Sequence, residues 1–189
     1  TARGERVLES GSVENVSAVE RRKIILATEA GLSSRTVRSE GTFENSGPIP
    51  PKPDQPTTYT IVWSIKNSFN QINGAEVRAT LPSYIRWTGL ANPSGENFVF
   101  NQVTNEVVWT PGTILPNTGF TSAARQVYFQ VEFIPSTSQV GTVPVLVGEA
   151  TLQGTDRVTG ASLGVSASPA TTNFSTDATF RQNDDKVVQ

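Results

Sequence analysis

An alternating stretch directly behind a run of prolines constrains the fold of this chain more than any other feature. The segment 57–67, TTYTIVWSIKN, places large apolar residues at every second position, with mostly small or polar residues between them. Side chains on a strand point alternately to opposite faces, so this pattern predicts a strand with one buried face. The preceding GPIPPKPDQP is expected to form an extended, semi-rigid loop, because proline fixes φ and lacks an amide donor.

Later segments repeat the alternation and predict an all-β fold. AEVRATL (75–81) and RQVYFQVEFIP (125–135) each place apolar side chains on one face, and FVF (98–100) pairs with EVVW (106–109) as a hairpin candidate. About eight to ten short strands, with turn signals every 8–12 residues or so, predict an Ig-like Greek-key β-sandwich. The positions expected to face inward are Tyr59, Ile61, Trp63, Ile65, Val77, Ala79, Leu81, Val127, Phe129, Val131 and Phe133.

The order of these segments predicts four regions in the 189 residues: an extended N-terminal arm (1–39), a proline-rich loop (40–56), the sandwich core (57–176) and a polar C-terminal tail (177–189). Within the arm, 1–22 fits either a short helix or an extended segment, because its valines recur at a spacing of three. Residues 23–39 alternate and are expected to be extended, with Gly31 as a bending point.

Composition excludes several chemistries. The chain has no His and no Cys, which removes Ser–His–Asp and Cys–His nucleophiles, His- or Cys-based zinc sites and disulfides. The net charge of −2, without a basic cluster, disfavours nucleic-acid binding. The longest apolar run is IILA at 24–27, far below the roughly 18 residues of a membrane span. Because no Met stands at position 1, we expect an excised or processed chain.

Four weaker candidates for chemistry remain. Ser64 and Lys66 share a strand face, but a catalytic lysine must be desolvated and Lys66 is expected to face solvent. An intramolecular isopeptide bond needs a buried lysine, and none of the four lysines lies on an apolar face. A calcium site would draw on the acidic cluster of the tail, which is better interpreted as solvated. The residues concerned are Lys23, Lys52, Lys66, Lys186, Asp156, Asp177, Asn183, Asp184 and Asp185.

Aromatic residues and sequons give the remaining candidates. Trp63 and Trp109 are in inward register and are expected in the core, whereas Trp87 lies near a loop and is the candidate for a carbohydrate platform. The sequons that begin at Asn15 and Asn173 are candidate glycan acceptors.

From about Ile24 onward, the chain resembles an immunoglobulin-like repeat of unknown function found in surface proteins of bacteria and archaea. The likeness covers roughly 150 residues, about one domain, and its last part is similar to the C-terminal domain of large surface proteins of candidate-phylum bacteria. It implies an extracellular role in architecture or adhesion, and no catalytic residue or cofactor. The matching residues are Thr58, Tyr59, Thr60, Ile61 and Asn67 of a TYTI element, and Val77, Thr80, Leu81 and Pro82 of a V-x-V-x-D-x-L-P element, in which Ala79-Thr80 stands where the family often has Asp.

We therefore expect a non-enzymatic structural protein of the cell surface, a filament or pilus-like subunit whose partner is another copy of itself. Its N-terminal strand would add to an open sheet edge of that neighbour. The residues expected in this inter-subunit strand are Ile24, Ile25, Leu26, Ala30 and Leu32. Two alternatives stay open: an adhesion module that binds carbohydrate or protein near Trp87, and a passive spacer in a stalk.

Overall fold

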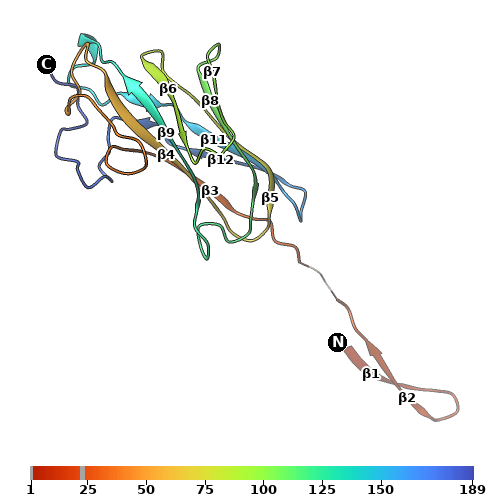
Figure 1. The fold of residues 1–189 in the computed structure, drawn as a ribbon. Helices are drawn as coiled ribbons and strands as arrows, with labels where there is room; N and C mark the ends of the chain where they lie inside the picture. Colours follow the sequence, from red (N-terminus) through yellow and green to blue (C-terminus); the bar gives the residue numbers. More distant parts are fainter. Residues whose placement is uncertain (1, 22–23) are drawn as a thin grey trace.

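The computed structural model describes residues 2–21 and 24–189, and two stacked antiparallel sheets form its main body (Figure 1). The first sheet has the order β3-β4-β9-β6, and the second has the order β12-β11-β5-β8-β7. The first sheet comprises β3 (Ala30–Val37), β4 (Thr57–Asn67), β9 (Arg125–Phe133) and β6 (Ile85–Asn92). The second comprises β12 (Ser162–Ala167), β11 (Ala150–Asp156), β5 (Ile72–Thr80), β8 (Glu106–Ile114) and β7 (Phe98–Asn101).

Successive strands cross between the two sheets, which confirms the predicted all-β Ig-like sandwich. The chain passes from β4 in one sheet to β5 in the other, returns in β6, and crosses again to β7 and β8. Two smaller pairings flank the sandwich, β1 with β2 and β10 with β13. Their bounds, with that of a 3-10 turn, are β1 (Ala2–Val7), β2 (Val13–Ala18), β10 (Val145–Val147), β13 (Ala170–Thr171) and η1 (Thr137–Gln139). Within the described ranges, no helix is long and apolar enough to cross a membrane.

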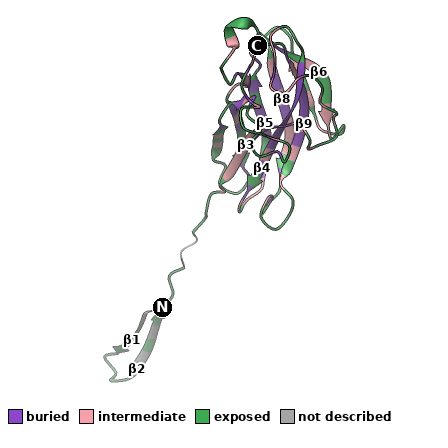
Figure 2. Ribbon diagram, turned by 90° about the vertical axis from the view of Figure 1, so that its left-hand side faces the viewer, coloured by how far each residue is buried: buried purple, intermediate pink, exposed green. Residues whose placement is uncertain are grey.

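The core lies between the two sheets and contains every position expected to face inward (Figure 2). Strand β4 lies between β3 and β9, so both of its edges are hydrogen-bonded. Trp63 of β4 meets Phe129 of β9 edge to face, with ring centroids 4.9 Å apart. Such aromatic pairs stabilise a core beyond the area they bury. The alternation of the sequence therefore identified the correct face of both strands.

The outer face of β4 differs from the expectation that it faces solvent. Thr60 and Val62 point away from the core, yet both are fully buried. The proline-rich loop covers this face at Thr60: Asn45 Nδ2 donates to Thr60 Oγ1 at 2.9 Å, and Gln130 Nε2 of β9 donates to the Glu44 carbonyl at 3.0 Å. Residues 40–56 thus form a lid on the first sheet, and β4 is buried on both faces.

The N-terminal region contains two strands that the sequence did not distinguish. Residues 2–18 form an antiparallel hairpin, in which Leu8 N donates to the Ser12 carbonyl at 2.9 Å at the turn. We call β1, β2 and this turn the N-terminal hairpin; it stands apart from the sandwich (Figure 1). Lys23, the first residue of the segment expected to be extended over 23–39, lies outside the described residues. Within 24–39 the strand is Ala30–Val37, whose register with β4 runs without interruption.

The C-terminal segment, residues 172–188, covers the end of the sandwich opposite the N-terminal hairpin (Figure 1), and we call it the C-terminal cap. Thr172 Oγ1 donates to the Asp185 carbonyl at 2.6 Å, and Val188 N donates to the Pro51 carbonyl at 2.9 Å. Asp177, Asp185 and Val187 are buried. The interpretation of this stretch as solvated is therefore wrong for Asp177 and Asp185, whose carboxylates accept from donors inside the protein, whereas Asn183 is exposed and Asp184 is partly buried.

Candidate functional site

The N-terminal segment is the candidate functional site, because it combines exposed apolar residues with an unpartnered hairpin. Ile24, Ile25 and Leu26 are 85%, 50% and 62% exposed. Phe69 and Val158, from two loops of the sandwich, are also more than half exposed and line a shallow apolar pocket together with these three residues. Exposed apolar residues gathered in one place are characteristic of interaction surfaces. We call these five residues the apolar patch.

Two residues expected in an inter-subunit strand lie elsewhere. Ala30 and Leu32 belong to β3 and pair with Asn67 and Ile65 of the same chain. Both are partly buried and pack against the core. Of the five residues singled out, only Ile24, Ile25 and Leu26 remain available to a neighbour in this arrangement.

The junction between the N-terminal segment and the sandwich is fixed by a polar cluster around Thr28. Thr28 N donates to Asp156 Oδ2 at 2.7 Å, and Thr28 Oγ1 donates to Asn67 Oδ1 at 2.7 Å. The same hydroxyl accepts from Phe69 N at 3.0 Å. Asn70 Nδ2 donates to the Leu26 carbonyl at 2.6 Å. We call this cluster the Thr28 anchor; it fixes where the chain leaves the domain.

Asp156 and Asn67 make the anchor rigid because both are buried and fully engaged. Asp156 accepts four hydrogen bonds, from Thr28 N and Asn70 Nδ2 on one oxygen and from Val158 N and Thr159 N on the other. Burial acts to raise the pKa of Asp156, but these donors outweigh it and hold the pKa well below its ordinary value. The carboxylate therefore stays ionised at neutral pH.

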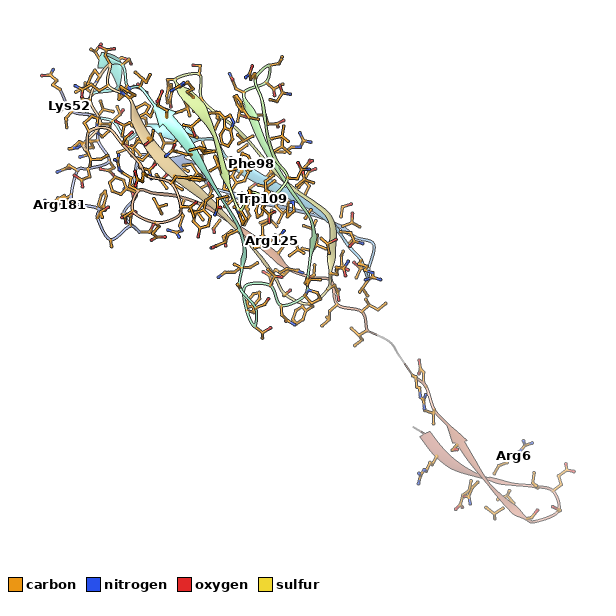
Figure 3. All side chains as sticks on the ribbon, in the orientation of Figure 1. Arg6, Lys52, Phe98, Trp109, Arg125 and Arg181 are labelled. Atoms are coloured by element: carbon orange, nitrogen blue, oxygen red, sulfur yellow. The ribbon has the colours of Figure 1, made fainter. Side chains whose placement is uncertain are left out.

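The N-terminal hairpin extends beyond this anchor and contacts solvent on every side chain whose placement is described (Figure 3 labels Arg6). Val7 and Val13, directly opposite each other, are 69% and 57% exposed. In the part of the chain that the structure describes, β1 and β2 pair only with each other. An isolated two-stranded hairpin is marginal in water, and a third strand or a packing surface is needed to stabilise it.

Trp87, the candidate carbohydrate platform, is partly buried in an aromatic cluster. Its ring stacks on Phe98 with centroids 5.2 Å apart and planes at 25°, and it also approaches Phe100 and Phe129. Figure 3 shows Phe98 and Trp109, which pair across β7 and β8, beside each other within the sandwich. One face of Trp87 is therefore already occupied by a side chain from β7.

In the C-terminal cap, the buried carboxylate of Asp177 accepts several hydrogen bonds. Asp177 accepts hydrogen bonds from the Arg38 and Ser39 amides, both at 2.7 Å, and from Thr179 N at 2.9 Å. Burial acts to raise the pKa of Asp177, but the donors from Ser39 and Thr179 outweigh it and lower the pKa well below the ordinary value. This arrangement joins the end of β3 to the cap, which is a structural task.

Tyr59 lies under the same cap beside Arg38. It is fully buried, and its hydroxyl forms no hydrogen bond of regular geometry with the described residues, although the Arg38 side chain lies close enough to interact with it. The Arg38 guanidinium sits over the Tyr59 ring, 5.5 Å from its centroid. Burial raises the pKa of Tyr59, so the phenol stays protonated.

The other candidate groups have ordinary surroundings. Lys66 is exposed, and Ser64 accepts from Gln126 Nε2 at 3.4 Å. Lys52 is partly buried and Lys186 is exposed, whereas Lys23 lies outside the described residues. Across residues 2–21 and 24–189, no three His, Cys, Asp or Glu side chains are grouped as a metal site requires.

The two sequons differ in availability. Asn15 is exposed on β2. Asn173 is also exposed, but its Nδ2 donates to Asp185 Oδ2 at 2.7 Å and its Oδ1 accepts from Ser175 N at 3.0 Å. A glycan on Asn173 would compete with the bonds that hold the cap.

Sequence reasoning missed the Thr28 anchor and the buried Asp177. The anchor joins residues as far apart as Thr28 and Asp156, which no local pattern connects. A partial signal was present in DRVTG at 156–160, because an Asp that accepts from the amides two and three residues later is a common turn.

No protein-family model matches this sequence, and no curated protein matches it. The resemblance to the surface-protein repeat is therefore not confirmed as family membership, although the β-sandwich it implied is present.

Several solved structures share features of the fold. The major pilin subunit of Bacillus cereus aligns with 90% of this chain at 12% identity and a TM-score of 0.49, and the chain spans about half of that pilin, 47%. The pilus tip protein Mfa5 of Porphyromonas gingivalis aligns with 57% of the chain (22% of its own length; 17% identity; TM-score 0.43). A β-N-acetylglucosaminidase of Vibrio harveyi aligns with 74% (18% of its own length; 10% identity; TM-score 0.42). Likenesses at this level include both pilins and an enzyme, so they carry no argument about function.

Proposed function

We propose that this chain is a non-enzymatic structural subunit of an extracellular assembly, and that its N-terminal segment joins it to another copy. The observation that carries the proposal is the N-terminal hairpin, a two-stranded unit with exposed edges held outside a folded domain. A stable sandwich does not need such an extension, whereas an assembly does. The cell-surface location rests on the resemblance of 57–82 to surface-protein repeats.

Two features of the junction support this role. The Thr28 anchor connects the segment firmly to the sandwich, so that a load or a contact on the hairpin reaches the folded domain. The apolar patch beside it offers Ile24, Ile25 and Leu26 for burial. Burying apolar surface stabilises an interface by about 25 cal/mol per Å² before the costs of association are subtracted.

A truncation tests the proposal. We expect the chain lacking residues 1–25 to keep its fold and to lose self-association, measured by light scattering after gel filtration and by electron microscopy. A cut at residue 30 would be unsuitable, because it also removes Thr28, which bonds to Asn67 and Asp156. Retention of the sandwich is checked by thermal unfolding. Undiminished association of the truncated chain would refute the proposal.

A further inference from the structure

The outer edge of β1 is an open strand edge that only charged side chains protect, because no proline, bulge or covering segment blunts it in the described chain. Natural edge strands are often blunted by charged side chains, by proline, by bulges, by very short length or by a covering segment. Two edge strands of the sandwich use such devices: β7 has four residues, and the pairing of β6 shifts between Trp87 and Ala91. The edge strand β12 resembles β1 in having six residues, no proline and a continuous register. However, β12 belongs to a five-stranded sheet, whereas β1 pairs only with β2 in the described chain. Its charged side chains are of both signs, so they repel a second copy of the strand in some registers and attract it in others.

The turn of the hairpin determines which residues of β1 offer free backbone groups. Leu8 N donates to the Ser12 carbonyl at 2.9 Å, so the backbone groups of Leu8 point across the hairpin. Positions of this kind alternate along a strand with positions whose amide and carbonyl point outward. The alternation assigns outward-pointing groups to Val7, Glu5 and Arg3.

We propose that two copies join edge to edge through β1, antiparallel, with Arg3 of each copy opposite Glu5 of the other. The proposal deepens the proposed function and rests on it. In this register the outward groups of Arg3 and Glu5 face each other, and each of the two pairs brings opposite charges together. A shift of two residues either way places Arg3 opposite Arg3, or Glu5 opposite Glu5. Opposite charges across a strand pair stabilise it, and like charges destabilise it.

The geometry of the hairpin leaves room for this arrangement. The turn at residues 8–12 is the end of the hairpin away from the sandwich, and the paired ends of β1 and β2 lie on the side of the connecting segment (Figure 1). An antiparallel pairing of two β1 strands sets the turn of one copy beside the connecting segment of the other. The two sandwiches then lie at opposite ends of the joined sheet. The product is a four-stranded sheet, whereas an isolated two-stranded hairpin is only marginally stable in water.

Charge-reversal variants of the full chain test this register. In a dimer of the Arg3→Glu variant, both pairs between the copies consist of two glutamates. In a dimer of the Glu5→Arg variant, both pairs consist of two arginines. We expect each variant to self-associate about tenfold more weakly than the natural chain at low ionic strength, because two pairs change sign. An equimolar mixture of the two variants restores opposite charges in both pairs, so it should associate like the natural chain. The measurement is sedimentation velocity over a concentration series.

Matched controls are Arg181→Glu and Glu149→Arg, which make the same charge changes at exposed positions on the sandwich, away from the N-terminal hairpin. They should leave association unchanged. If the single variants associate like the natural chain, or if mixing does not restore association, the β1 register is wrong, even where removal of residues 1–25 abolishes association. If the natural chain is monomeric throughout, or if the truncated chain still associates, both proposals are overturned.

Discussion

Replacing Asp177 by Asn is expected to loosen the C-terminal cap. Asp177 is 4% exposed and its carboxylate accepts five hydrogen bonds. One oxygen accepts from the amides of Arg38 and Ser39, both at 2.7 Å. The other accepts from Ser39 Oγ at 2.6 Å and from Thr179 N and Oγ1 at 2.9 and 2.7 Å. The side chain is thus the point at which the cap is attached to the end of β3.

The magnitude follows from what an amide can replace. The side-chain amide of the Asp177→Asn variant would keep one acceptor oxygen and would present an NH₂ group to the donors of the other. Hydroxyls can rotate to accept, but at least one backbone N–H is left without a partner, at a cost of about 1–3 kcal/mol. The remaining bonds change from charged to neutral and lose about 1 kcal/mol more. We expect a loss of about 2–4 kcal/mol, or about 5–15 °C in the midpoint of thermal unfolding.

The effect depends on pH in a direction that the pKa of Asp177 sets. The folded-state pKa lies below that of the unfolded chain, so the carboxylate stabilises the fold fully above the unfolded value, about 3.9. That contribution is lost as the pH falls from about 4 through the folded pKa. Asn does not titrate, so the difference in stability between the natural chain and the variant should shrink below about pH 4.

Urea unfolding at neutral pH, followed by tryptophan fluorescence and repeated at acid pH, measures both effects. Asp184→Asn serves as the control, because Asp184 is only partly buried and accepts from Arg181 N within its own turn. That variant should change stability by less than about 1 kcal/mol. A loss below about 1 kcal/mol for Asp177→Asn, or a difference that stays constant down to about pH 3, would contradict this account of the cap.

Two further substitutions test the lid and the anchor. Gly47→Ala should destabilise the fold by about 2–4 kcal/mol in thermal unfolding, because Gly47 has φ +88° and an added Cβ would collide with the Pro56 carbonyl. The control Gly164→Ala should change stability little, because an added Cβ there meets no atom within 4 Å. Thr28→Val should lower the free energy of unfolding by about 1–3 kcal/mol, because it leaves the Phe69 amide without its acceptor. It should also speed proteolysis within residues 24–29. An unchanged rate of cleavage would show that the anchor does not hold the segment.

The sequence predicted the sandwich where burial follows the period of a strand. In β9, Val127, Phe129, Val131 and Phe133 alternate with polar residues, and all four are buried. The alternation arises from the pleat itself, so it can be recognised without knowledge of the neighbouring strands. The same reasoning failed on the outer face of β4, because Thr60 is covered by a loop whose position depends on side-chain hydrogen bonds at Asn45 and Gln130.

Polar residues that hold distant segments together were beyond local reasoning. Asp177 and Asp185 were interpreted as solvated charges in a polar stretch, and their burial depends on donors from Arg38, directly after β3, and from Asn173. A buried carboxylate is acceptable only when such donors are present, and no spacing in the sequence announces them. The N-terminal hairpin was missed for another reason: its strands alternate too weakly, because neither face of the hairpin is buried within the described chain.

The anchor and the hairpin have separable consequences for assembly. Only residues 19–27 connect β2 to Thr28, which limits the distance between hairpin and sandwich to about 30 Å even when the chain is fully extended. A short connection that is fixed at one end loses little conformational freedom when the hairpin binds, and this keeps the entropic cost of association low. Charge reversal at Arg3 or Glu5 should therefore act on the affinity of the contact, whereas Thr28→Val should lengthen the free connection and broaden the distance between the two sandwiches. Distance measurement between spin labels on the sandwiches of a dimer separates the two effects, and an equally narrow distribution in the Thr28 variant would show that the anchor has no part in the geometry.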